Sequence, residues 1–291
     1  MYIKLKEAVP ISAWYMLLSA LGFSLMAACV KSASNLGIPV FEIVAARAIV
    51  SVILSYIVVR QKKISIWGNN KPLLIARGTI GAMALMCVYY AIATLPLAEA
   101  TILQYLYPVF TACLALIFLN ERVQRSTMTC IVLCLIGLSV MLEPNLQSHN
   151  EALYPWLSIG IALLGSIGSG TAYVIVKKLT KTEDSSVIIF YFPMIALPVS
   201  LILLGDDFIV PSLAVTGLLV LIGIFTQVGQ VGLTKAMHSA DASKATAYSY
   251  VQVIFSVLIG WVYFSETPVL TTIIGGSLIM SGALINVLWK R

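Results

Sequence analysis

Ten apolar stretches, each close to the roughly 20 residues that a helix needs to cross a bilayer, run through this chain. Backbone amides cannot stay unpaired in hydrocarbon, so stretches of this kind must be helical. With 60% hydrophobic and only 10% charged residues, the chain lies far from the composition of soluble proteins. We therefore predict an all-α integral membrane protein with ten transmembrane helices. The spans are expected at about 12–32, 38–59, 73–94, 98–119, 125–142, 153–176, 186–204, 212–233, 243–264 and 269–288.

Residues near the end of the first half of the chain recur at a constant offset of 145 (236 − 91). The recurring pairs are Ala91 and Ala236, Ala100 and Ala245, Thr101 and Thr246, Tyr105 and Tyr250, Phe110 and Phe255, and Glu121 and Glu266, while Lys31 recurs one residue out of step as Lys177. Five spans in each repeat invert the second copy relative to the first. We expect two repeats, 1–145 and 146–291, that form one structural domain around a central cavity. This plan is typical of secondary transporters, which move small organic solutes by alternating access.

The basic residues are distributed unevenly across the predicted topology. If the N-terminus is cytoplasmic, 15 of the 18 Lys and Arg fall on the cytoplasmic side: Lys4, Lys6, Arg60, Lys62, Lys63, Lys71, Arg122, Arg125, Lys177, Lys178, Lys181, Lys235, Lys244, Lys290 and Arg291. Basic residues are enriched on the cytoplasmic side of membrane proteins, so we expect both termini there, in the inner membrane of a prokaryote. The net charge of +6 then attracts membrane lipids rather than nucleic acid. The expected partners are a small-molecule substrate and lipids, with the protein a monomer or a homodimer.

Arg47 lies near the middle of the second predicted span, where a guanidinium costs at least roughly 2.5–3.5 kcal/mol. It therefore needs a carboxylate, several carbonyl groups or a water-filled cavity. Glu42 is the nearest acid in sequence, but five residues turn a helix by about 140°, so the two do not share a face. Two interpretations stay open: a structural arginine bound to carbonyl groups of a neighbouring helix, or an arginine that holds an anionic group of a substrate.

Aromatic and amide side chains gather at mid-membrane positions in both halves. The candidate substrate-binding residues are Arg47, Tyr89, Gln104, Tyr105, Tyr173, Gln227, Tyr250 and Trp14. A pocket of tyrosine rings and a few hydrogen-bonding groups suits a flat or cationic organic solute. The alternative is that some of these tyrosines lie at headgroup level or in packed helix interfaces.

Four glutamates stand at the ends of predicted spans. Glu121 and Glu266 come just before the next helix, where the helix dipole favours a carboxylate, so we assign them a structural capping role. Glu42 and Glu99 are the carboxylates nearest the bilayer core and the candidates for proton coupling. Both histidines lie in predicted loops, so a facilitator or an exchanger is at least as plausible as a proton-coupled pump.

The chain carries few groups for chemistry on a substrate. It has no HExxH motif, no Ser–His pair within a span and no Cys/His cluster, so we expect no metal, no cofactor and no enzyme activity. Its five cysteines all lie in predicted spans and are interpreted as small packing residues. A membrane-embedded lipid-modifying enzyme remains the alternative from another class, followed by a channel or scaffold.

Several short motifs are spread over nearly the whole chain. In the first half they are Phe41-Glu42 with Arg47, Arg77-Gly78, Leu95 through Thr101, and Leu119 through Arg122; in the second they are Phe190-Tyr191, Lys235-Ala236, Ala245 through Tyr250, and Phe264 through Pro268. Together they resemble the EamA-type members of the drug/metabolite transporter superfamily. The resemblance implies a ten-helix bundle whose first, third, fourth, sixth, eighth and ninth spans line a central cavity. It favours Tyr89, Tyr105, Tyr250, Gln227 and Trp14 as lining residues.

Within that superfamily the chain is similar to bacterial S-adenosylmethionine uptake transporters. The similarity lies in Phe41-Glu42 with Arg47, in Ala100-Thr101 and Ala245-Thr246, and in Tyr248 with Tyr250. The chain departs from that subgroup at Ser249 and Gln252, where an arginine and a glutamate are expected. Uptake or exchange of S-adenosylmethionine is therefore the specific alternative to transport of another small organic solute.

Overall fold

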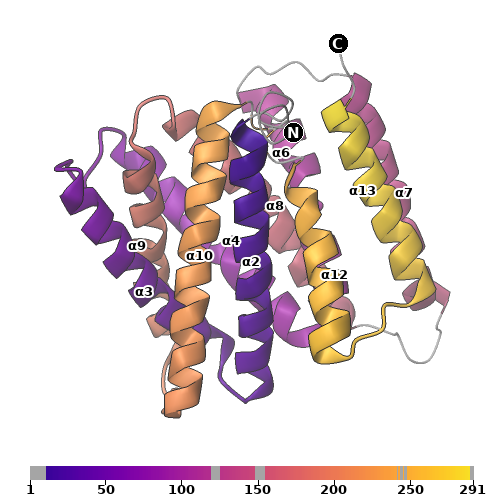
Figure 1. Ribbon diagram of the computed structural model, residues 1–291, viewed down its shortest axis with the longest axis horizontal. Coiled ribbons are helices and arrows are strands. Elements are labelled where there is room, and N and C mark those ends of the chain that lie inside the picture. The colour runs from indigo at the N-terminus through magenta and orange to yellow at the C-terminus, as the bar shows by residue number, and fades with distance from the viewer. Residues whose placement is uncertain are drawn as a thin grey trace, which may run out of the picture.

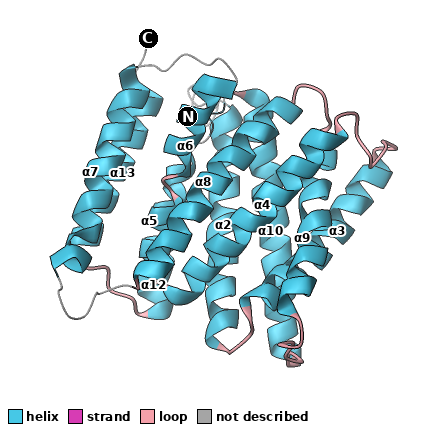
Figure 2. Ribbon diagram, turned by 180° about the vertical axis from the view of Figure 1, so that it is seen from behind, coloured by secondary structure: helices cyan, strands magenta, loops and turns pink. Residues whose placement is uncertain are grey.

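The computed structural model describes residues 11–118, 125–147, 155–240, 242, 245 and 248–288, and these residues form helices and connecting loops without a strand (Figures 1 and 2). The α-helices are α2 (Ile11–Asn35), α3 (Val40–Gln61), α4 (Lys71–Thr94), α5 (Leu97–Gln104), α6 (Tyr107–Phe118), α7 (Arg125–Gln147), α8 (Trp156–Leu179), α9 (Ser185–Leu204), α10 (Leu213–Ser239), α12 (Val251–Phe264) and α13 (Leu270–Leu288). A short 3₁₀ turn, η1 (Tyr248–Tyr250), precedes α12.

Seven segments of the described chain are long and apolar enough to cross a bilayer. They are α2, α3, α4, the α5–α6 segment Glu99–Phe118, α8, α9 and α10. Large apolar side chains cover their outer faces, among them Met83, Ile117 and Ile202, which are 67%, 67% and 78% exposed. The predicted all-α membrane fold is confirmed at this level. The count of ten spans stays a prediction, with α7, α12 and α13 as the further candidates.

The fourth predicted span, 98–119, is not one continuous helix in the structure. It is broken at Tyr105 and Leu106, between α5 and α6. Pro108 explains the break, because its ring has no N–H to donate and collides with the carbonyl group four residues earlier. In the ninth predicted span, 243–264, Ala245 is helical, and the 3₁₀ turn η1 then precedes α12, which begins at Val251. The two interruptions fall at corresponding places in the two halves of the chain.

Four helix pairs make the most extensive contacts in the bundle: α2 with α10, α4 with α8, α3 with α9, and α7 with α13. In both views α7 and α13 stand together at one side of the bundle, and α3 and α9 stand at the opposite side (Figures 1 and 2). Each pair brings together one helix from each half of the chain, so the halves are interleaved rather than stacked as separate units.

Glycines bring the paired helices close together, because they have no side chain to keep the backbones apart. A Cβ atom on Gly232 of α10 would lie 2.5 Å from the backbone oxygen of Tyr15 in α2. On Gly22 of α2 it would lie 2.9 Å from the backbone nitrogen of Gly229. Backbone atoms cannot move aside as a flexible side chain can, so the α2–α10 contact depends on these positions being glycine.

We expect Gly232→Ala to destabilise the protein by about 1–3 kcal/mol, because the added methyl group forces α2 and α10 apart. Gly217→Ala in the same helix is the matched control, since a Cβ atom there meets nothing within 4 Å. Alanine is a better helix former than glycine, so Gly217→Ala should be neutral or stabilising by up to about 1 kcal/mol. Melting temperatures of the two detergent-solubilised variants test this; equal values would contradict the packing described for α2 and α10.

Candidate functional site

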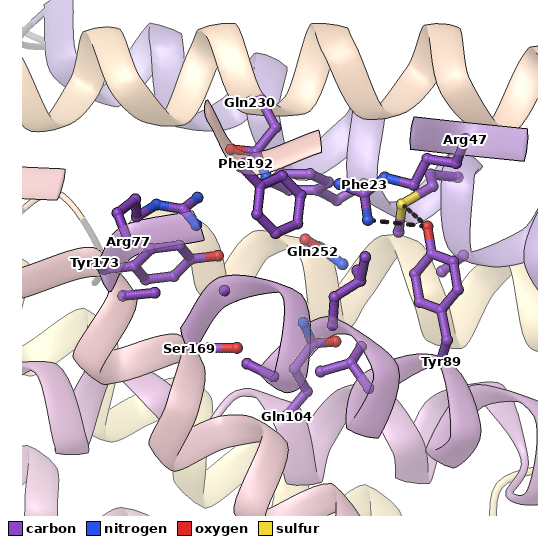
Figure 3. Close-up of a pocket in the computed structure, with 17 residues that line it drawn as sticks. Phe23, Arg47, Arg77, Tyr89, Gln104, Ser169, Tyr173, Phe192, Gln230 and Gln252 are labelled. Atoms are coloured by element: carbon purple, nitrogen blue, oxygen red, sulfur yellow. Dashed lines mark hydrogen bonds between the residues drawn. The ribbon is translucent and has the colours of Figure 1, made fainter. Parts of the chain in front are cut away.

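A cavity of about 60 Å³ lies inside the bundle, where helices from both halves of the chain meet (Figure 3). One water molecule needs roughly 10–15 Å³ of such volume, so the cavity holds a few waters in this conformation. Its lining residues are Phe23, Met26 and Ala27 of α2, Arg47 of α3, Arg77, Gly81, Ala84, Leu85, Val88 and Tyr89 of α4, Gln104 of α5, Ser169, Ala172 and Tyr173 of α8, Phe192 of α9, Gln230 of α10 and Gln252 of α12.

Arg47 projects from α3 into this cavity and is 2% exposed. Its Nη1 donates a hydrogen bond of 3.3 Å to the hydroxyl oxygen of Tyr89, which in turn donates to the sulfur of Met26 at 3.0 Å. The guanidinium carbon also lies 5.0 Å from the centroid of the Phe192 ring. Cation–π contacts of this kind contribute about 0.5–2 kcal/mol, so they offset only part of the cost of burying the charge.

Arg77 of α4 is a second buried cation on the same cavity, and we did not predict it as a site residue. It is 3% exposed, and its guanidinium carbon lies 4.8 Å from the centroid of the Phe192 ring. Its Nε and Nη1 have no hydrogen-bond partner among the described residues. The sequence held a usable signal, because Lys31, Arg47 and Arg77 are the three basic residues outside the cytoplasmic set. An ionisable residue inside a span marks a functional site by default.

Neutral polar groups face the two arginines across the cavity. Gln104 and Ser169 lie on the side opposite Arg47 and Arg77, with Gln252 between them (Figure 3). The hydroxyl group of Tyr105 donates to Oε1 of Gln252, which joins the break after α5 to the start of α12. The cavity therefore offers amide and hydroxyl groups that can turn either a donor or an acceptor toward a bound molecule.

Four predicted binding residues line this cavity together: Arg47, Tyr89, Gln104 and Tyr173. Tyr105 is buried directly behind the cavity wall through its bond to Gln252. The backbone of Tyr250 lies in η1, whereas its side chain is outside the described residues.

Two other predicted binding residues lie elsewhere. Trp14 is 51% exposed on the outer face of α2, which is typical of aromatic residues at the membrane interface rather than of a cavity wall. Gln227 donates from Nε2 to the hydroxyl oxygen of Ser55 in α3 at 2.9 Å, and its neighbour Gln230 faces the cavity instead. Three residues turn a helix by about 300°, which separates the two side chains by roughly 60° around the axis of α10.

The two glutamates considered for coupling are buried but do not line the cavity. Glu42 is 4% exposed and accepts a 3.0 Å hydrogen bond at Oε2 from the backbone N–H of Ile209, in the loop before α10. Glu99 is 2% exposed and accepts a 3.0 Å hydrogen bond from Oγ1 of Thr272 in α13. The first contact joins α3 to the loop before α10 and the second joins α5 to α13, so each carboxylate has a structural partner away from the arginines.

Glu266 forms a partly buried contact with Lys31 at the end of the bundle where α2 ends. Its Oε1 pairs with Nζ of Lys31, and its Oε2 accepts a 2.9 Å hydrogen bond from the backbone N–H of Leu97. Nζ of Lys31 also donates to the backbone oxygen of Leu95 at 3.0 Å. Glu266 therefore caps α5, in the other half of the chain, and not the helix α13 that follows it. Glu121, its counterpart in the repeat, lies outside the described residues.

No group of three or more His, Cys, Asp or Glu with metal-binding proximity occurs among the described residues. Cys29, Cys87 and Cys113 are free. The side chains of Cys130 and Cys134, the remaining two cysteines, are not described.

We expect Glu266→Gln to lower the stability of the protein by about 1–3 kcal/mol, because the ammonium group of Lys31 stays buried without a counter-charge. The glutamine can still accept the N–H of Leu97, so the change isolates the ion pair. Lys62→Gln is the control, since it breaks an exposed ion pair with Asp184, 2.8 Å long and worth about 0–1 kcal/mol. Melting temperatures of the variants should separate clearly. Equal, small effects would show that the Lys31–Glu266 pair does not stabilise this end of the bundle.

Known proteins resemble this chain in sequence and in fold. A model of the EamA-like transporter family matches residues 10–143 and again residues 156–288. The pseudopaline exporter CntI of Pseudomonas aeruginosa is 34% identical over 264 residues, which cover 90% of this chain and 91% of the exporter. An S-adenosylmethionine uptake transporter of Rickettsia felis is 28% identical over 218 residues, which cover 74% of this chain and 72% of that protein.

A solved crystal structure shares the fold, with a TM-score of 0.74 over 95% of this chain and 96% of its own, at 18% sequence identity. The family matches cover most of the chain, and the relatives are transporters of small solutes. The resemblance read from the motifs is confirmed, and the chain is a multi-pass membrane protein that belongs to the EamA-like transporter family.

Proposed function

We propose that this protein is a secondary carrier that moves a small organic solute across the bacterial inner membrane by alternating access through the central cavity. The observation that carries the proposal is the cavity itself, which is buried inside the bundle and lined by polar side chains from helices of both halves. Polar groups at this depth are costly unless they serve a solute or a water path, so their convergence favours a binding site.

Two inverted five-span repeats, 1–145 and 146–291, are the second part of the proposal. The helix pairs support it: exchanging α2 with α8 and α4 with α10 converts the α2–α10 pair into the α8–α4 pair, and both are observed. The lysine contacts support it too. Nζ of Lys31 donates to the oxygen of Leu95, and Nζ of Lys177 donates at 2.8 Å to the oxygen of Ala240, which is Leu95 shifted by the repeat offset.

The interrupted helices lie where a carrier needs them. Discontinuous helices at the midplane supply free backbone groups and hinge points in many transporters. Here the breaks at Tyr105–Leu106 and at η1 adjoin the cavity residues Gln104 and Gln252. Because the cavity holds only a few waters, an organic solute enters only if the helices around the cavity move apart.

In the alternating-access cycle, the Lys31–Glu266 pair would act as a gate that is closed in this conformation. It joins α2, the α4–α5 loop and the α12–α13 loop at one end of the bundle. If the termini are cytoplasmic, as the distribution of Lys and Arg predicts, this end faces the outside. The conformation is then closed to the exterior, and opening requires this pair to separate.

The relatives carry different solutes by name, so they leave the substrate of this chain open. S-adenosylmethionine carries a sulfonium cation, whereas the cavity presents two guanidinium groups and, among its described lining residues, no carboxylate. Gln252 stands where we expect a glutamate in that subgroup. These features favour a different solute. We also propose exchange or facilitated transport rather than proton coupling, because Glu42 and Glu99 lie away from the cavity lining.

The test is solute transport by purified protein in liposomes, with Ser169→Phe as the blocking variant. We expect saturable uptake that is accelerated by solute preloaded inside the liposomes, since a carrier exchanges faster than it returns empty. Ser169 lines the cavity and is 8% exposed, so a phenyl ring there should fill the cavity and reduce the transport rate at least roughly tenfold.

Leu164→Phe on the same helix is the matched control, because Leu164 is 62% exposed toward lipid and its replacement should leave transport unchanged. Melting temperatures of both variants show whether they fold. Transport by folded Ser169→Phe at the wild-type rate would place the path elsewhere. Unitary currents without saturation would favour a channel, and a lipid product lost on changing one acidic residue would favour the enzyme alternative.

A further inference from the structure

Arg47 and Arg77 form a pair of buried cations to which the described residues supply no counter-charge. Their guanidinium carbons lie 5.0 and 4.8 Å from the centroid of one ring, that of Phe192, and both side chains line the cavity. Within the described part of the chain neither arginine takes part in an ion pair. Figure 3 shows Arg47 beside Tyr89 and Arg77 beside Tyr173, with Phe192 between the two arginines.

The hydrogen bonds of the two arginines are incomplete. Arg47 donates to the hydroxyl oxygen of Tyr89, while Nε and Nη1 of Arg77 are buried without a described partner. A buried donor without an acceptor is unfavourable, and a charged one is more so. Among the described residues, no acceptor oxygen of the cavity lies within hydrogen-bond distance of Nε and Nη1 of Arg77.

Lys177 shows how this fold satisfies a cation with a structural role. Its Nζ donates to the backbone oxygens of Met237 and Ala240 at 3.1 and 2.8 Å, at the end of α10. Carbonyl oxygens at a helix C-terminus are the usual partners of a structural cation in a membrane protein. Arg77 has no such contact through Nε or Nη1, although the same types of helix surround it.

We propose that the solute is a small organic dianion whose two anionic groups, carboxylate or phosphate, bind Arg47 and Arg77. This assignment rests on the carrier function proposed above and names its substrate class. A guanidinium matches the planar fork of a carboxylate or the oxygen atoms of a phosphate. Gln104, Ser169 and Gln252, across the cavity, hydrogen-bond the uncharged part of the molecule.

Gly81 provides the space in which the guanidinium group of Arg77 lies. A Cβ atom on Gly81 would collide with Nη1 of Arg77. Gly81→Ala therefore displaces the charged end of Arg77 while the charge itself remains in the protein. The variant therefore tests whether binding depends on where the guanidinium group lies, and not only on whether its charge is present.

Binding of five-carbon probes to the full-length protein in phosphatidylcholine nanodiscs tests the proposal, since this lipid has no net anionic headgroup to compete. The probes are glutarate, its neutral analogue glutaramide and the dication 1,5-diaminopentane, with citrate and 3-phosphoglycerate, which carries one carboxylate and one phosphate, as further anions. A ligand that binds the folded state raises its melting temperature. We expect a shift with at least one of the three anions and none with glutaramide or diaminopentane. A preference for 3-phosphoglycerate over glutarate and citrate would indicate that one of the two anionic groups is a phosphate.

For the anion that binds, Arg47→Gln, Arg77→Gln and Gly81→Ala should each weaken binding by about tenfold to a hundredfold, since each removes or displaces charge-assisted hydrogen bonds. Lys62→Gln, outside the cavity, should leave affinity unchanged. A second readout excludes a merely structural role: ligand-free Arg77→Gln should melt no lower than wild type, because it removes a buried charge without a counter-ion.

Three results would overturn the assignment. None of the three anions binds; or glutaramide or diaminopentane binds in their place; or Arg77→Gln lowers the melting temperature of the ligand-free protein and leaves anion affinity intact. Saturable transport of an uncharged or cationic solute that Ser169→Phe blocks would refute the dianion class alone and leave the carrier proposal standing. If the protein neither transports nor binds any solute tested, both the carrier function and the dianion assignment are refuted.

Discussion

Hydrocarbon cannot solvate a charge, so every ionic group inside this bundle depends on the protein or on a bound molecule for its partners. Three buried basic side chains meet this requirement to different degrees. Lys31, near the end of α2, has the carboxylate of Glu266 and a backbone oxygen. Arg47 has the hydroxyl group of Tyr89 and aromatic rings. Arg77 has a ring face but, among the described residues, no acceptor for Nε or Nη1. The hydrogen-bond and ion-pair partners thus become fewer from Lys31, at the end of the bundle, to Arg77, at the cavity. There a bound solute can supply the missing acceptors.

Small residues serve two purposes in these helices: close packing and space for a charged side chain. Gly22 and Gly232 bring the backbones of α2 and α10 together, so a larger residue at either position would force these helices apart. Gly81 instead leaves room for the guanidinium group of Arg77 at the cavity. The breaks at Tyr105–Leu106 and at η1 interrupt the helices beside the cavity residues Gln104 and Gln252. This arrangement agrees with the carrier proposed above, in which packed groups of helices move relative to one another around the cavity.

Much of the fold could be predicted from sequence, whereas the site could be predicted only in part. Arg47, Tyr89, Gln104 and Tyr173 come together because polar groups at mid-depth avoid lipid. Trp14 faces outward because an indole ring near a helix end is equally stable at the membrane interface. The side chain of Gln227 donates a hydrogen bond to Ser55 of α3, so its amide group is satisfied outside the cavity. The site predicted from the sequence does not include Arg77, although a charged residue inside a predicted span is itself a signal of function.

The sequence by itself determined which segments are helices in the membrane, because only long apolar runs with internally paired backbone can exist there. It also determined membership of the EamA-like family, through motifs spread along the chain. Only the tertiary structure decided which face of each helix turns inward, since lipid and protein interior are equally apolar and leave little periodicity to read. It alone placed Arg47 and Arg77, thirty residues apart (77 − 47), against one ring of Phe192, because three different helices must pack before those side chains can meet.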